Sequence, residues 1–113
     1  ARYAINKIAT YFEESELFRD EGSIEHILPE SEGGNNNNIG NLILLEQTLN
    51  EDADCLSYSD KINVYNRSSY RWVQNFISEN SQWDNTMILP RAKKLAIFYY
   101  KNILNKLIPS DDM

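Results

Sequence analysis

The sequence predicts an α+β fold that is mostly helical and contains one small two-stranded antiparallel hairpin. Two short apolar segments, residues 23–28 and 41–45, are separated by a polar loop with four consecutive Asn, which is typical of two strands and their connection. The segments on both sides of this pair carry apolar residues at helical spacing. A length of 113 residues allows a single hydrophobic core, so we expect one domain over residues 1–113.

The first expected helix runs from Arg2 to about Leu17. Its apolar residues recur at helical intervals and form one face, made of Ile5, Ile8, Ala9 and Phe12. Three Glu near its end are interpreted as solvated surface without a catalytic role. Gly22 is expected to end the helical segment.

The hairpin and one helix follow. Ser23–Leu28 has the alternating, β-branched character of a short strand, and Pro29 should end it. Residues 30–40 are a loop by composition. Asn41–Leu45 has the length of a buried strand, and Gln47–Asp54 continues at once with helical spacing. The predicted local order is therefore strand, loop, strand, helix.

Three more helices are expected in the second half of the chain. The first is Ser59–Asn66, capped by its own first residue. The second is Ser69–Glu79, whose aromatic residues we assign to the core rather than to base stacking. The last is a long helix after Asp84. It is either kinked at Pro90 or begins near Leu89 with this proline in its first turn.

The composition excludes several classes of site and location. No apolar run approaches the roughly 18 residues that cross a bilayer, and no signal peptide is recognisable, so we expect a cytoplasmic domain without membrane contact. The chain has one His and one Cys, His26 and Cys55, which are too few for a structural zinc site. A metal ion would therefore be held mainly by oxygen ligands.

The charge is divided unevenly along the sequence. The net charge is −6, but residues 1–60 carry three basic and thirteen acidic side chains, and residues 61–113 carry eight basic and four acidic ones. The balances of −10 and +4 permit a local basic face on an acidic protein. Arg91, Lys94 and Lys101 share one face of the last helix. Both a solvated surface and a phosphate-binding surface fit this pattern.

Three polar residues have the chemistry that phosphodiester hydrolysis needs. Imidazole can take a proton near neutral pH, and carboxylate and amide oxygens suit Mg²⁺ or Mn²⁺. His26, Glu25 and Asn50 supply these groups. A lone histidine in a short strand is also consistent with a hydrogen-bonded structural residue. Moreover, neighbours in a regular strand point to opposite faces, so Glu25 and His26 can share a site only if the strand ends, bulges or twists there.

Three sequence blocks in order resemble a known family. Glu-His-Ile-Leu-Pro at residues 25–29, Ile-Gly-Asn-Leu-Ile-Leu-Leu at 39–45 and Leu-Asn at 49–50 are similar to the His-Asn-Asn pattern of HNH endonucleases, the ββα-metal or His-Me finger group. The closer resemblance is to the His-x-x-Pro branch, found as the C-terminal nuclease domain of GmrSD-type restriction and phage-defence proteins. It covers roughly residues 3–100. The ββα-metal core would then be residues 23–54.

The resemblance implies a role for each matching residue. His26 would act as general base on the attacking water, and Glu25 and Asn50 would bind one divalent cation, Mg²⁺ or Mn²⁺. Asn41 would brace the loop and the histidine. The candidate substrate-binding residues are Lys61, Arg91 and Lys94.

The expected function is therefore metal-dependent endonuclease activity, in the form of DNA nicking or cleavage in restriction or phage defence. The alternative is a nuclease-derived binding or assembly module that no longer cuts. It is motivated by Glu51, Asp52 and Asp54, which follow the third block where small or basic residues are expected. An unrelated helical interaction domain is a third possibility. The alanine at position 1 and the polar last segment are typical of a piece of a longer protein, so further domains of the same chain are expected as partners.

Overall fold

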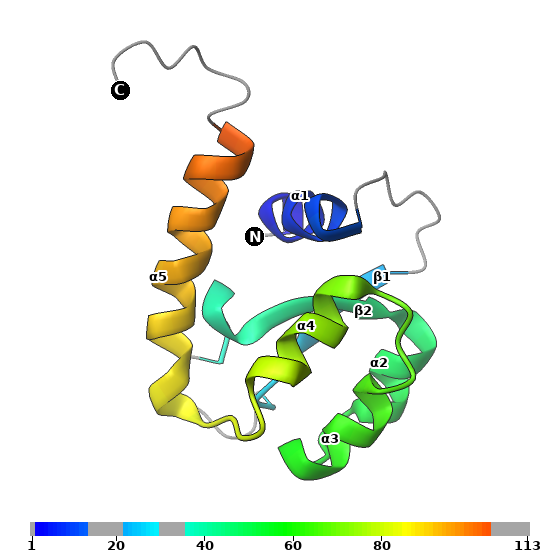
Figure 1. Ribbon diagram of the computed structural model, residues 1–113. Coiled ribbons are helices and arrows are strands. Elements are labelled where there is room, and N and C mark those ends of the chain that lie inside the picture. Colours follow the sequence, from blue (N-terminus) through cyan, green and yellow to red (C-terminus); the bar gives the residue numbers. More distant parts are fainter. Residues whose placement is uncertain (1, 14–21, 30–35, 105–113) are drawn as a thin grey trace, which may run out of the picture.

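The computed structural model describes residues 2–13, 22–29 and 36–104 (Figure 1). In this part of the chain one antiparallel hairpin is surrounded by helices. The α+β class predicted from the sequence is therefore confirmed.

The hairpin consists of β1 (Gly22–His26) and β2 (Leu42–Glu46), with Gly22 opposite Glu46 and His26 opposite Leu42. The first strand ends at His26, two residues before the predicted end. The reason is Asn41, whose side-chain oxygen accepts the backbone N–H of Leu28 at 2.8 Å. A side chain replaces the strand partner at that point, so pairing stops. Asn41 itself lies in a short 3-10 turn, η2 (Ile39–Asn41), and β2 begins one residue later than predicted.

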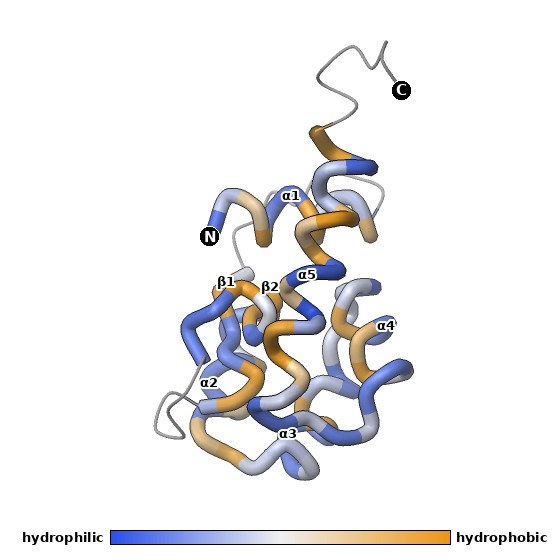
Figure 2. The backbone as a smooth tube through the Cα atoms, turned by 90° about the vertical axis from the view of Figure 1, so that its left-hand side faces the viewer, coloured by the Kyte–Doolittle hydropathy of each residue, from blue (hydrophilic) through white to orange (hydrophobic). Residues whose placement is uncertain are grey.

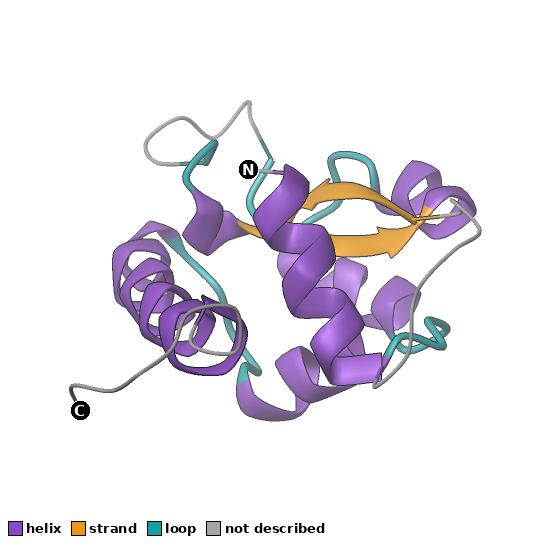
Figure 3. Cartoon of the chain, turned by 90° about the horizontal axis from the view of Figure 1, so that it is seen from above, coloured by secondary structure: helices purple, strands orange, loops and turns teal. Residues whose placement is uncertain are grey.

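Helix α1 (Arg2–Glu13) lies against β2 and α4. The face predicted from its spacing is the one that packs, because Ile5, Ile8 and Ala9 are fully buried. The predicted end at Leu17 lies outside the described residues. Figure 3 shows α1 crossing over the hairpin when the molecule is viewed from above.

Three helices follow the hairpin, in the predicted order. They are α2 (Gln47–Ala53), α3 (Tyr58–Tyr65) and α4 (Arg71–Glu79). The cap predicted for α3 was wrong. Ser57 rather than Ser59 is the N-cap, because its extended backbone lets its hydroxyl accept the N–H of Asp60.

The last helix, α5 (Ile88–Tyr99), is preceded by the short 3-10 turn η3 (Asn85–Met87) and followed by one π-helical turn, η4 (Tyr100–Leu104). Asp84 is a cap as predicted, but it caps η3 rather than α5. Pro90 stands in the first turn of α5, where its missing N–H has no intrahelical partner to lose. Of the two sequence alternatives, the start near Leu89 is therefore the one observed.

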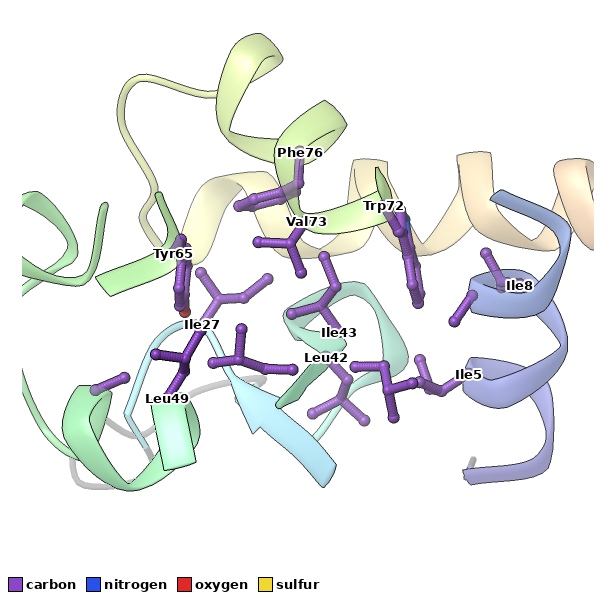
Figure 4. Packing of buried hydrophobic residues seen from close by; sticks show 14 of the residues in the cluster. Ile5, Ile8, Ile27, Leu42, Ile43, Leu49, Tyr65, Trp72, Val73 and Phe76 are labelled. Carbon is purple, nitrogen blue, oxygen red and sulfur yellow. The ribbon is translucent and has the colours of Figure 1, made fainter. Parts of the chain in front are cut away.

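The core lies between the hairpin, α1 and α4. Figure 4 shows side chains from these elements meeting, with Ile5 and Ile8 on one side and Trp72 and Val73 on the other. The aromatic residues of α4 are buried, as predicted. Along α4 and α5, apolar and polar positions alternate around the helix (Figure 2), which is the pattern of helices that bury one face. Among the described residues no helix has the length and apolar character of a membrane span.

Gly40 joins η2 to α5 at a distance that only glycine allows. A Cβ atom there would lie 2.0 Å from the carbonyl oxygen of Ile88 and 2.8 Å from the backbone nitrogen of Ala92. Because these are backbone atoms of a helix, they cannot turn aside. The close approach sets the position of the segment that contains Asn41.

We expect Gly40→Ala to lower the free energy of unfolding by roughly 2 kcal/mol or more, because the backbone of α5 must shift. Gly22→Ala is the matched control, since its Cβ would meet only the flexible side chain of Leu44, at 2.9 Å. Urea denaturation of both variants measures the difference. Equal loss in the two variants would contradict the close approach of η2 and α5.

Candidate active site

A cavity of about 640 Å³ lies between the end of β1 and helix α2. It brings together Glu25, His26 and Asn50, three residues that the sequence assigned to one site. Its lining is Ser23, Glu25, His26, Pro29, Gln47, Asn50, Glu51, Asp54 and Cys55. Helix α2 packs against β1 and carries Asn50 of the third block to the cavity that His26 lines.

His26 is the last residue of β1 and is partly exposed. Its Nε2 lies 3.0 Å from the side-chain oxygen of Asn37. An amide oxygen can only accept, so this nitrogen carries a hydrogen. His26 and its neighbour Glu25 are both paired in the hairpin, opposite Leu42 and Ile43, and both line the cavity.

Asn50 is fixed by the hairpin through its amide nitrogen. That nitrogen donates to the hydroxyl of Ser23 at 2.8 Å and to the carbonyl of Ile24 at 2.9 Å. The carbonyl of Ile24 can only accept, which defines the orientation of the amide. The side-chain oxygen of Asn50 receives no hydrogen bond from the described residues. It is therefore available to a cation.

Glu25 is buried, with 2% of its surface exposed. One carboxylate oxygen, Oε2, accepts from Lys61 at 2.8 Å and from the hydroxyl of Tyr65 at 2.5 Å. Burial raises the pKa of Glu25, and the charge of Lys61 opposes this rise. Burial and the neighbouring carboxylate raise the pKa of Tyr65 well above its usual value, so its hydroxyl remains a donor. The second oxygen, Oε1, accepts no hydrogen bond from the residues that the structure describes.

Lys61 is fully buried and lies against β1. Besides the ion pair with Glu25, its ammonium group donates to the backbone carbonyl of His26 at 2.7 Å. The sequence named Lys61 as a substrate-binding residue. In the structure its charge instead connects two neighbouring residues of the strand, away from solvent.

Asn41 is fully buried and uses its whole amide group inside the protein. Its oxygen accepts from the N–H of Leu28 at 2.8 Å and from the indole of Trp83 at 3.0 Å, and its nitrogen donates to the carbonyls of Leu28 and Asn36. The geometry is that of a brace for the backbone two residues after His26. The tight binding of both amide atoms leaves Asn41 no capacity for a metal or a substrate.

Arg91 and Lys94 lie at a different cavity, between α4 and α5. One nitrogen of Arg91, Nη1, donates to the carbonyls of Gly40 and Leu42, both at 2.9 Å. The predicted residues therefore form two groups. Glu25, His26 and Asn50 share the first cavity, and Arg91 and Lys94 line the second.

Residues 1–97 match the family model for the C-terminal domain of GmrSD restriction endonucleases. The chain belongs to this family. No curated protein and no solved structure matches it. The family predicted from the three sequence blocks is thereby confirmed. Membership of this family indicates the general context of a restriction endonuclease.

Several functional contacts of the GmrSD-type domain were not predicted from the sequence. Tyr65 and Lys61 are four residues apart in α3, a spacing that places two side chains on one helical face. This spacing could have indicated that the two side chains share a partner. Trp83 lies in an irregular segment, where no periodicity indicates a partner. The hydrogen bond between Nε2 of His26 and the side-chain oxygen of Asn37 gives one residue of the Asn run a specific role.

The oxygen donors of this cavity fit a hard divalent cation in kind. Oε1 of Glu25 and the amide oxygen of Asn50 are both oxygen ligands without a hydrogen bond in the described part of the chain, which suits Mg²⁺ or Mn²⁺. No group of three or more His, Cys, Asp or Glu in the described residues could hold a metal. An ion here would therefore depend on the amide oxygen of Asn50, on water and on substrate oxygens.

We expect Lys61→Met to destabilise the GmrSD-type domain by roughly 3 kcal/mol at neutral pH, because it leaves a buried carboxylate without its counter-charge. The loss should be larger near pH 8 than near pH 5. The pKa of Glu25 is raised in the folded state, so its ionisation costs stability as the pH rises through that pKa, and removal of Lys61 raises it further. Urea denaturation at both pH values measures the effect.

The double variant Lys61→Met, Glu25→Gln is the matched control. It removes both charges, so it should recover most of the stability and lose the pH dependence. A single variant whose stability does not change with pH would contradict the buried ion pair.

Proposed function

We propose that this domain is an HNH-type, metal-dependent endonuclease that hydrolyses phosphodiester bonds of DNA by nicking or cleavage. The supporting observation is the single cavity that His26, Glu25 and Asn50 line together. It combines a group that can accept a proton with two oxygen ligands that have no other hydrogen bond among the described residues. Family membership supports the same class of reaction.

Each residue has a separate task in this proposal. The contact with Asn37 holds His26 in orientation. His26 then removes a proton from the attacking water. Glu25 and Asn50 hold the divalent cation, which would stabilise the charge that develops on the phosphate oxygens. Asn41 keeps the backbone after the histidine in place through Leu28.

Lys61 is a positioning residue in this proposal rather than a phosphate ligand. Its ammonium group contacts the carboxylate of Glu25 and the carbonyl of His26 at 2.8 and 2.7 Å. It therefore fixes the distance between a metal ligand and the general base. Tyr65 donates to the same oxygen as Lys61. The other oxygen, Oε1, would hold the cation.

The setting of this activity belongs to the proposal as well. The family description supports DNA as the substrate and restriction or phage defence as the process. We propose that the domain acts in the cytoplasm, together with further domains of the same chain.

An inactive binding or assembly module is the second candidate function. It is favoured by the acidic lining of the cavity, where Glu51 and Asp54 accompany Glu25 and repel a phosphate backbone. It is also favoured by the hydrogen bonds that already engage Oε2 of Glu25. The two candidates differ in one measurable property, since only the endonuclease requires a cation beside His26.

We expect His26→Ala to reduce plasmid nicking in Mg²⁺ or Mn²⁺ by roughly 100-fold or more, because the general base is lost. Circular dichroism should show an unchanged fold, since the imidazole is at the surface of the hairpin. Asn63→Ala is the control, because this exposed residue of α3 is outside the cavity. Undiminished cutting by His26→Ala would exclude the proposed mechanism, and cutting in EDTA would exclude the metal.

We expect Mn²⁺ to broaden the imidazole NMR signals of His26, which belong to the only histidine of the chain. For Asn50→Ala, the Mn²⁺ concentration that produces the same broadening should be about tenfold higher or more, because an oxygen ligand is lost. Ser23→Ala is the matched control. It removes one hydrogen bond of Asn50 and keeps the amide oxygen. Unbroadened signals at saturating Mn²⁺ would favour the inactive module.

A further inference from the structure

A second cavity, of about 520 Å³, lies between helices α4 and α5 and is separate from the proposed active site. Aromatic side chains form much of its wall, and two basic residues of α5 complete it. The lining residues that matter here are Trp72, Phe76, Trp83, Phe98, Arg91 and Lys94. A volume of this size is in the range of small-ligand sites. Helices α4 and α5 contribute most of these residues.

The aromatic rings gather around one positive charge. The guanidinium carbon of Arg91 lies 4.9 Å from the ring centre of Phe76, 5.6 Å from that of Trp72 and 6.0 Å from that of Trp83. These rings are mostly buried, so only a small part of each one reaches the cavity. The combination is an apolar wall with a fixed cation behind it.

The charge of Arg91 has no carboxylate partner among the described residues. Its Nη1 donates to two backbone carbonyls, and its buried Nη2 has no hydrogen-bond partner in the same part of the chain. Burial lowers the pKa of Arg91 to about 10, which leaves it charged at neutral pH. A partly buried cation without a carboxylate partner attracts an anion. Since Nη2 is covered, Arg91 contributes its charge rather than a direct hydrogen bond.

The rim of the cavity carries polar groups that complement this wall. Lys94 is exposed and stands one turn after Arg91 on α5. Asn75, Asn80 and Thr86 add two amides and a hydroxyl, and Glu79 adds one carboxylate to the lining. Amide and hydroxyl groups can bond the edges of nucleobases, and a lysine can contact a phosphate.

We propose that this cavity binds a single nucleotide, with its planar base in the apolar part of the cavity and its phosphate beside Lys94. A nucleotide combines a flat ring, hydrogen-bonding edges and a negative charge, and the cavity has a group for each. The inference rests on the proposed function, because it assigns part of the nucleic-acid substrate to a second site. The same chemistry has two sources, a nucleotide extruded from DNA and a free nucleotide.

Two residues of the cavity also support the active site, and this guides the choice of variants. Trp83 donates to Asn41, and Arg91 donates to the carbonyls of Gly40 and Leu42. Substitution of either would disturb the hairpin whether or not a ligand binds. Lys94 makes no such contact, so its substitution tests the cavity alone.

Tryptophan fluorescence provides a direct measurement, because both tryptophans of the chain, Trp72 and Trp83, line the cavity. The wild-type domain is titrated in EDTA with thymidine 5′-monophosphate, with a DNA duplex that has one unpaired thymidine, and with the same duplex fully paired. EDTA prevents cleavage, so binding is measured apart from catalysis. We expect a saturable fluorescence change that the fully paired duplex does not produce.

The probes distinguish the two sources of the nucleotide, and the lysine variants test whether it binds in this cavity. A change with the bulged duplex alone supports an extruded nucleotide, and a change with the mononucleotide alone supports a free one. Lys94→Gln should weaken binding about fivefold or more through loss of a phosphate contact. The neighbouring Lys93→Gln should not, because Lys93 is exposed but outside the cavity lining.

Three results would overturn the proposal. They are no fluorescence change with any probe, an equal change with the paired duplex, and an equal loss in the two lysine variants. In each case the nicking assay on wild-type domain still tests the endonuclease function separately. Nicking by the wild-type domain without a fluorescence change would therefore support the endonuclease function and exclude nucleotide binding in this cavity.

Discussion

The buried ion pair of Lys61 and Glu25 is the interaction on which the proposed site depends. Both side chains are almost completely buried, and neither charge could remain inside the protein without the other. The ammonium group also holds the carbonyl of His26. Helix α3 thereby fixes the last two residues of β1. The relative position of a proposed metal ligand and a proposed base therefore depends on the packing of α3 against the hairpin. A disturbance of α3 should reach the site directly.

Asn41 fixes the backbone directly after the two neighbouring site residues of β1. Glu25 and His26 are both paired in the hairpin, and both line the cavity. The side chain of Asn41 takes the place of a strand partner at Leu28, so β1 ends at the histidine and the backbone turns. Trp83 and Gly40 hold Asn41 against the C-terminal half of the molecule. The strand end therefore depends on α5, which is distant in sequence.

Local patterns were sufficient for the elements, whereas the resemblance to the HNH pattern pointed to the three residues of the first cavity. Apolar spacing located α2 and α4 to within two residues. The order of the three sequence blocks indicated that Asn50 would share a site with His26, and both residues line the first cavity. Burial of charge was not predictable in the same way. Basic side chains are expected at the surface, yet Lys61 is enclosed because its partner Glu25 comes from a strand 36 residues earlier. Long-range pairs of this kind leave no periodic signal in the sequence.

The charge division of the sequence takes on a different meaning in the folded domain. The basic second half suggested a face for DNA, but Lys61 and Arg91 turn their charges toward the hairpin of the acidic half, and Arg67 pairs with Asp52 at 2.6 Å. Part of the excess positive charge is thus used to join the two halves of the chain. The proposed active-site cavity remains acidic. In the proposed mechanism, attraction of a phosphate backbone to this cavity would require the divalent cation, which would couple substrate binding to metal binding.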